Sequence, residues 1–129
     1  DMNNEERAVD YLDSAFNRHD MAHVATYWSD KYIQHNPLLA NGVPAIKSAI
    51  EDPRNQNMTW VAGMTFSSGD IVAVHGLYRN FLGEKDMVTV DFLRFADGKV
   101  VEHWDVMQEA VKPEHSANGN AMFPIDVKQ

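Results

Sequence analysis

From Met58 onward the apolar residues of the chain recur at every second position, and short polar turns interrupt the pattern. β-Branched and aromatic residues are enriched in the resulting segments, which read TWVAGMTF, IVAVHGLYRNF, MVTVDFLRFA and KVVEHWDVMQ. The connections SSGD, LGEKD and ADGK are short enough to join consecutive antiparallel strands. Asp97 and Gly98 form the strongest turn signal, because both residues tolerate the positive φ of a tight hairpin. The pattern therefore predicts an antiparallel sheet over residues 58–110.

The first part of the chain, residues 1–52, has a helical period instead. Asn3 and Glu6 stand at the spacing of a capping box, directly before an apolar stripe. Asp20 can cap a second helix, and Pro44 suits the first turn of a third. Helices that precede a meander of strands indicate an α+β fold rather than a doubly wound one.

Length, charge and composition limit the classes of protein. A chain of 129 residues suits one domain, in which residues 111–129 form a polar tail. The net charge of -8 argues against a nucleic-acid or anionic-membrane partner, and the absence of cysteine excludes a thiolate nucleophile. No apolar run approaches the roughly 18 residues of a membrane span. We expect a cytoplasmic protein, although a leader removed before Asp1 would leave no trace.

The predicted strands carry apolar residues on both faces, so both faces of the sheet need cover. Three short helices can cover only one of them. Glu102, Trp104 and Val106 share one face of the last strand and suit a subunit interface, so we expect a homodimer through the outer sheet face. The alternative is that the tail folds over this face, anchored by Met122 and Phe123.

Ionisable residues stand among apolar neighbours in the predicted sheet. His103 and Asp105 share one strand face, because side chains two positions apart in a strand point the same way. Two such groups are costly to bury unless they are paired or serve a function. If the helices pack on this face, the meander can bring Asp91 and His75 beside them, together with His35 from the extended segment before the sheet. We therefore expect an apolar pocket with a polar centre.

A pocket of this kind supports proton transfer. A carboxylate among apolar side chains loses solvation and becomes more basic, while a neighbouring imidazole can donate to a substrate oxygen. Removing a proton next to a carbonyl requires both functions. Each residue also has a structural interpretation: His75 can be a packing residue, Asp91 can satisfy a strand edge, and Trp60 and Met107 are either core or pocket wall.

A metal site is a further alternative. His35, His75 and His103, with a carboxylate, could form a three-histidine site of the kind that zinc and iron accept. Their spacing gives no sign of convergence, and no two of them have the close helical spacing of a metal motif. We therefore expect no metal ion.

The order of these segments resembles a known family. Helices, then DKYIQHNPLLANG, then VDFLRFADGKVVEHWDVMQ and finally SANGNAMF are similar to the SnoaL-like polyketide cyclase branch of the nuclear-transport-factor-2-like superfamily, over nearly the whole chain. The resemblance implies a cone, in which a curved antiparallel sheet wraps over the N-terminal helices, and dimerisation through the outer face of that sheet. It also implies aldol cyclisation without metal or cofactor, with an Asp as base.

In the cyclases this Asp follows a His by two positions on a late strand, which corresponds to Asp105 and His103 here. The resemblance thus implies that Asp105 is the base, with His103 beside it, and that His35 and His75 line the same cavity and polarise a carbonyl. His75, Asp91, Trp60 and Met107 are the residues expected to bind substrate.

These observations lead to one preferred function and two alternatives. The preferred function is a cofactor-free enzyme in which Asp105 removes a proton next to a carbonyl of a small hydrophobic substrate, followed by aldol cyclisation or isomerisation. A non-catalytic small-molecule binding domain is the first alternative. The second is a hydrolase with a water molecule activated between Asp105 and Asp91. Because one fold houses many activities, the resemblance alone does not choose among them.

Overall fold

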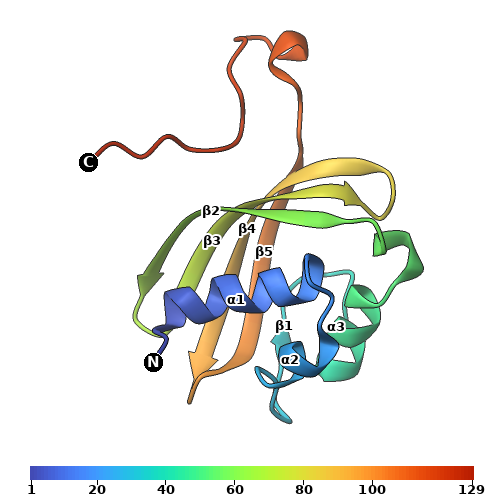
Figure 1. Ribbon diagram of the computed structural model, residues 1–129, viewed down its shortest axis with the longest axis vertical. Coiled ribbons are helices and arrows are strands. Elements are labelled where there is room, and N and C mark those ends of the chain that lie inside the picture. The colour runs from blue at the N-terminus through green and yellow to red at the C-terminus, as the bar shows by residue number, and fades with distance from the viewer.

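The computed structural model describes residues 1–129 and contains helices along one side of a single curved sheet (Figure 1). The order of strands in the sheet is β1-β5-β4-β3-β2. The last four strands form three consecutive antiparallel pairs, as the period-two pattern predicted. The elements are α1 (Asn4–Phe16), α2 (Met21–Ala25), β1 (Ile33–Gln34), α3 (Val43–Ile50), η1 (Pro53–Asn55), β2 (Thr59–Ser68), β3 (Ile71–Phe81), β4 (Lys85–Ala96), β5 (Lys99–Glu109) and η2 (Pro113–His115).

The first two helices begin at the predicted caps. The Asn3 side chain accepts a hydrogen bond from the Glu6 N–H at 2.8 Å, and the Glu6 carboxylate accepts one from the Asn3 N–H at 2.9 Å. These two contacts complete the capping box and satisfy N–H groups that a helix start leaves free. Asp20 caps α2 in a similar way, through the N–H of His23. None of the helices has the length and apolar character that a membrane crossing requires.

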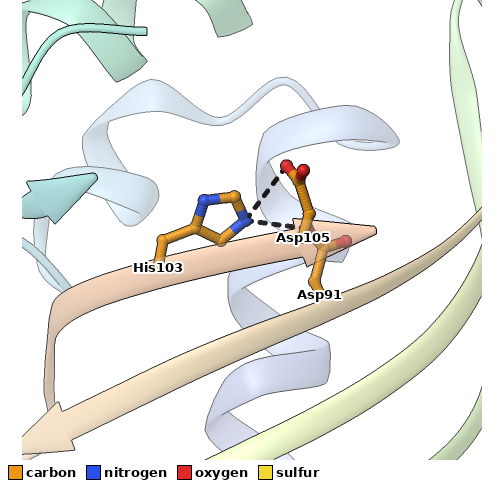
Figure 2. Close-up of side chains that lie close together, drawn as sticks. All are labelled: Asp91, His103 and Asp105. Atoms are coloured by element: carbon orange, nitrogen blue, oxygen red, sulfur yellow. Dashed lines mark hydrogen bonds and ion pairs between the residues drawn. The ribbon is translucent and has the colours of Figure 1, made fainter. Parts of the chain in front are cut away.

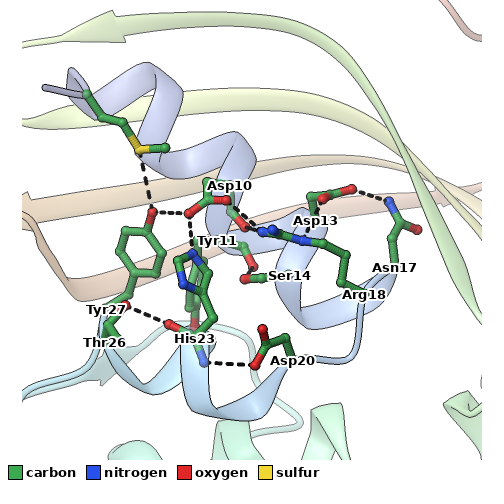
Figure 3. A network of polar contacts seen from close by, with 11 residues as sticks. Asp10, Tyr11, Asp13, Ser14, Asn17, Arg18, Asp20, His23, Thr26 and Tyr27 are labelled. Atoms are coloured by element: carbon green, nitrogen blue, oxygen red, sulfur yellow. Dashed lines mark hydrogen bonds and ion pairs between the residues drawn. The ribbon is translucent and has the colours of Figure 1, made fainter.

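A polar cluster ties α2 to α1 (Figure 3). Asp10 on α1 accepts hydrogen bonds from the Tyr27 hydroxyl, from His23 Nε2 at 2.6 Å and from Arg18 at 2.6 Å. Burial alone would raise the pKa of Asp10, but the three hydrogen bonds outweigh it, so the pKa of this carboxyl is lowered. The cluster fixes the position of the chain that leads into β1.

The two-residue strand β1 is absent from the sequence-based expectation. It pairs parallel with β5, with Ile33 opposite Glu102 and Gln34 opposite His103, and the pairing continues in a hydrogen bond from the His35 N–H to the His103 carbonyl at 2.9 Å. The sheet is therefore mixed rather than purely antiparallel. This short pairing places the segment around Gln34 beside the middle of β5.

Irregular register bends the long strands around α1. The pairing shifts between Ala62 and Thr65, between Tyr78 and Phe81, and between Arg94 and Phe95. Extra residues of this kind bend a strand and increase its twist. The inner face of the bent sheet and the helices bury one hydrophobic core, whose fully buried members include Val24, Met58, Val72, Val74, Leu93 and Val100.

The outer face of the sheet is only partly covered. The ring of Phe123, in the tail, lies 5.1 Å from the ring of His75. Elsewhere on this face Phe66 and Val106 are 53% and 66% exposed. The tail is thus anchored near its expected residue Phe123, but much of the apolar face remains open.

Candidate active site

An apolar cavity of about 530 Å³ lies between the helices and the inner face of the sheet. Its apolar wall comes from the helices, from the loops before α3 and β2, and from β3, β4 and β5, and includes Leu12, Leu39, Ile46, Met58, Phe81, Met87 and Met107. Asp91, His103 and Asp105 line the same cavity, and so do Asp52 and Arg54, which form an ion pair with each other. A mostly apolar pocket with a few convergent polar groups is typical of a small-molecule site.

Asp91, His103 and Asp105 converge because of the register between β4 and β5 (Figure 2). Asp91 and Asp105 are directly opposite partners, and His103 lies two residues along the same face of β5. The Nε2 atom of His103 lies 2.8 Å from Asp91 Oδ1 and 3.7 Å from Asp105 Oδ2. Opposite positions in an antiparallel pair bring side chains close together, so the sheet itself builds this group.

Gln34 on β1 determines the protonation of the His103 ring. Its side-chain oxygen accepts from the backbone N–H groups of His35 at 3.1 Å and Asn36 at 3.0 Å, and lies 2.7 Å from His103 Nδ1. Two N–H donors identify this atom as the oxygen, since the amide nitrogen could not accept from them. His103 Nδ1 must therefore carry a hydrogen. The contact between His103 Nε2 and Asp91 Oδ1 then contains one hydrogen, which is bound either to the nitrogen or to the oxygen.

The two carboxylates have different surroundings. Both oxygens of Asp91 are engaged, one by His103 and the other by the Tyr78 hydroxyl at 2.7 Å. Asp105 accepts one hydrogen bond, from the Asn36 amide at 2.8 Å, and its Oδ1 has no partner in the protein. Burial raises the pKa of Asp105, while Asn36 and His103 only partly oppose this shift. Asp105 is thus the carboxylate with a free oxygen and increased basicity.

His35 does not reach the cavity, contrary to the expectation. Its ring stacks on Trp104 with a centroid distance of 4.8 Å and an interplanar angle of 2°, and its Nε2 lies 2.7 Å from Glu102. Alternation along β1 explains the error: Gln34 points inward to His103, so the next side chain points outward.

His75 also lies on the outer face, so the prediction that it lines the pocket is wrong. Val74 is the direct partner of Asp91 and shares its inward face, so the neighbouring His75 must point the other way. There its ring contacts Phe123 of the tail, and its Nδ1 is buried without a hydrogen-bond partner. Since His35 and His75 both face away from His103, the three-histidine metal site cannot form.

The two apolar residues expected to bind substrate, Met107 and Trp60, occupy different places. Met107 lines the cavity as a wall residue. Trp60 lies on the inner side of the sheet but is packed in the core, 4% exposed, and does not line the cavity. Its indole nitrogen occupies the space next to Gly76, where an added Cβ would lie 2.4 Å away. Trp60 therefore fills the end of the core, and it is not a substrate contact.

Asp91, His103 and Asp105 are also the group that could hold a metal ion. One ligand atom from each lies within 4.8 Å of the others. Two carboxylates and an imidazole suit several divalent cations.

The residues that sequence reasoning missed are Gln34, Asn36 and Tyr78, whose contacts depend on the β1 pairing and on the strand register. The only available signal was the polar run QHN in front of Pro37.

Comparison with known proteins agrees with this architecture. A family model described as SnoaL-like domain matches residues 8–103. The chain is a member of the SnoaL-like domain family. The matched part of this SnoaL-like protein contains Asp91 and His103 and ends two residues before Asp105. No curated protein sequence is significantly similar to it.

Solved structures resemble this SnoaL-like protein in fold. A candidate ketosteroid isomerase from Kribbella flavida is 19% identical, with a TM-score of 0.70 over 97% of this chain and 93% of that one. IdmH, a candidate polyketide cyclase from Streptomyces antibioticus, is 18% identical, with a TM-score of 0.63 over 81% and 92%. An NTF2-like protein of unknown function from Cytophaga hutchinsonii is 9% identical, with a TM-score of 0.65 over 84% and 92%. The fold is thus the α+β cone of the nuclear-transport-factor-2-like superfamily.

Proposed function

We propose that this SnoaL-like protein is a cofactor-free acid/base enzyme that removes a proton next to a carbonyl of a small hydrophobic substrate. The observation that carries the proposal is the state of Asp105 at the polar end of an apolar cavity. Burial raises the pKa of this carboxyl, and its Oδ1 has no partner in the protein. A carboxylate in these surroundings is a base with space for a substrate proton.

In the proposed reaction, Asp105 Oδ1 takes the proton from the carbon next to the carbonyl. The electron pair of the broken C–H bond forms the C=C bond of an enolate, and the negative charge moves to the carbonyl oxygen. A hydrogen-bond donor must face that oxygen. His103 can supply one only by sharing with the ligand the Nε2 hydrogen that it holds against Asp91 at 2.8 Å, at a site 3.7 Å from Asp105.

Two outcomes follow from one enolate. Return of the proton from Asp105 to a different carbon isomerises the substrate. Attack of the enolate carbon on a second carbonyl of the same molecule closes a ring, and the new alkoxide takes the proton held by Asp105, which returns the base to its ionised form. The names of two structural relatives, a candidate ketosteroid isomerase and a candidate polyketide cyclase, fit these two outcomes. The apolar walls of the cavity favour a hydrophobic substrate.

The hydrolase alternative has less support. It requires a water molecule held between Asp105 and Asp91, with both carboxylates available to it. The oxygens of Asp91 are already engaged by His103 and Tyr78, so this carboxylate has little capacity for a catalytic water.

The direct test is exchange of α-protons with deuterium from solvent, followed by NMR. 2-Tetralone is a suitable probe, because it is a small, apolar ketone with acidic α-protons. We expect the protein to accelerate exchange, and Asp105→Asn to lower the rate at least 100-fold, which is the scale of general-base catalysis. The affinity of this variant for the ketone should stay within a few-fold of wild type, because the carboxamide keeps the shape of the side chain.

His35→Gln is the matched control, since His35 lies on the outer face and away from the cavity. This variant should exchange protons at the wild-type rate. Binding of the ketone without accelerated exchange in the wild-type protein would indicate a binding domain instead. Exchange that survives Asp105→Asn would assign the base to another residue.

A further inference from the structure

The tail that follows β5 extends away from the sheet, and the proton transfer above does not use it (Figure 1). It contains the sequence SANGN at residues 116–120, the start of one of the stretches that resemble the SnoaL-like family. Asn118 and Gly119 are both exposed. An asparagine side chain reacts most readily with the backbone nitrogen after it when the next residue is glycine, because glycine has no side chain to hinder the approach.

Three hydrogen bonds join the Asn118 side chain to its neighbours. Asn118 Oδ1 accepts from the Asn120 N–H at 2.9 Å and from the Ser116 hydroxyl at 3.0 Å. The Gly119 N–H donates to the same Ser116 oxygen at 2.9 Å. The Asn120 N–H can only donate, so the atom that it contacts is the amide oxygen, and Ser116 must give that oxygen its single hydrogen. One hydroxyl thus bridges the Gly119 nitrogen and the Asn118 carboxamide.

This arrangement suits attack of the Gly119 nitrogen on the Asn118 side-chain carbon. The attacking nitrogen must lose its hydrogen while negative charge develops on Oδ1. Ser116 can accept the Gly119 hydrogen and at the same time give its own hydrogen to Oδ1, which is general acid–base catalysis by one group. The Asn120 N–H is a second donor to the same oxygen, as in an oxyanion hole.

We propose that Asn118 is a self-modification site, at which Ser116 relays the proton that lets the Gly119 nitrogen close a succinimide ring on the Asn118 side chain. A bond forms between Gly119 N and Asn118 Cγ, and the Gly119 hydrogen is replaced through Ser116 by a hydrogen on Oδ1. The side-chain nitrogen then leaves as ammonia, taking that hydrogen, and the carbonyl re-forms. Water opens the ring to aspartate or isoaspartate, which adds one negative charge to the tail.

The chain contains a second Asn–Gly pair, Asn41–Gly42, in different surroundings. The Gly42 N–H donates to the backbone carbonyl of Tyr32 at 2.8 Å, and Asn41 Oδ1 accepts from the Gln34 N–H at 2.8 Å. Neither partner can both accept a hydrogen and give one back. Asn41 should therefore persist in the folded protein, and it serves as an internal control for Asn118.

The test is incubation of the folded, full-length protein at neutral pH, followed by peptide mass spectrometry, which detects the succinimide and its two hydrolysis products at each asparagine. Asn118 should react at least about 10-fold faster in the folded protein than in the same protein unfolded in guanidinium chloride, a modest gain for general acid–base catalysis. Asn41 should show the opposite order. A rate at Asn118 that is no higher in the folded than in the unfolded protein would overturn the proposal.

Variants of the tail identify the relay. Ser116→Ala should lower the rate at Asn118 in the folded protein to that of the unfolded chain, whereas Ser116→Thr keeps a hydroxyl and should retain most of the wild-type rate. Ser68→Ala, at an exposed serine at the end of β2, is the matched control and should leave the rate unchanged. An unchanged rate in Ser116→Ala would overturn the role of Ser116.

This modification does not depend on the proton transfer at Asp105. Asp105→Asn should abolish α-proton exchange of the ketone and still modify Asn118 at the wild-type rate. Ser116→Ala should exchange the protons of the ketone at the wild-type rate, because Ser116 lies in the tail and not among the residues that line the cavity.

Discussion

Asp91 and Asp105 stand directly opposite each other on β4 and β5, yet only Asp91 has both carboxylate oxygens engaged. Two carboxylates at one site take different roles when their surroundings differ in this way. Asp91 is the fixed acceptor for Tyr78 and for the proton shared with His103. Asp105 retains a free oxygen that faces the cavity, and its removal should therefore affect function more than folding.

Alanine substitutions should separate the two carboxylates in stability. Asp91→Ala leaves the His103 ring and the Tyr78 hydroxyl buried without their partner, so we expect a loss of about 3–5 kcal/mol in the free energy of unfolding. Asp105→Ala removes a less engaged group and should change it by about 1 kcal/mol or less. Urea unfolding at pH 7 measures both values. Equal losses would show that the two residues are equivalent structural groups.

The rate of α-proton exchange should depend on pH through Asp105. A base must be ionised to accept a proton, and burial raises the pKa of this carboxyl above its ordinary value of 3.8. The rate should therefore fall as the pH decreases through the raised pKa, at a higher pH than an exposed aspartate would require. A rate that stays constant down to pH 4 would exclude Asp105 as the base.

The raised pKa of Asp105 also predicts how the stability of the fold depends on pH: ionisation of this carboxyl favours activity but lowers the free energy of unfolding. Because the pKa of Asp105 is higher in the folded than in the unfolded protein, this group stabilises the fold below about pH 3.8 and loses that contribution as the pH rises through the folded value. Asp105→Asn should thus be more stable than wild type at pH 7, and this advantage should shrink towards pH 4. Urea titrations at several pH values test the trend.

Gln34 should determine which nitrogen of His103 is protonated. In the wild-type protein, nitrogen-15 NMR should show a hydrogen on Nδ1 at every pH where the fold persists, because Gln34 Oε1 accepts from it at 2.7 Å. Gln34→Leu should release this preference, lower the exchange rate and cost about 1–3 kcal/mol through the unpaired buried N–H. Gln34→Glu keeps an acceptor and should preserve the tautomer. A wild-type ring protonated only at Nε2 would contradict the assignment.

We propose that the open outer face pairs with a second copy of the chain. Phe66, Ala73, Phe92 and Trp104 form one continuous row across four strands on this face, and the next row ends at Val106.

Light scattering coupled to size-exclusion chromatography should show that the wild-type protein is a dimer. Val106 is 66% exposed in the single chain, and Val106→Lys should convert the dimer to a monomer. Val127→Lys, in the tail, is the control and should remain dimeric. A monomeric wild-type protein at high micromolar concentration would reject the proposal.

Much of the architecture is local in origin and could be predicted. The alternating pattern after Met58 and the short turns determine consecutive antiparallel strands, and the spacing of His103 and Asp105 places both on one face. The caps at Asn3 and Asp20 likewise act within a few residues of sequence. These features depend on backbone geometry that each segment carries by itself.

The composition of the site depended on contacts between distant segments. Alternation says which residues share a face, but not which face the helices cover, so it does not reveal that His35 and His75 point outward. The pairing of β1 with β5 brings Gln34 to His103 across 69 positions of the chain. A two-residue strand is too short to show an alternating pattern in the sequence. It forms because the strand beside it pairs with it. Backbone geometry within each segment sets the strands and their two faces, and contacts between distant segments select the face that encloses the chemistry.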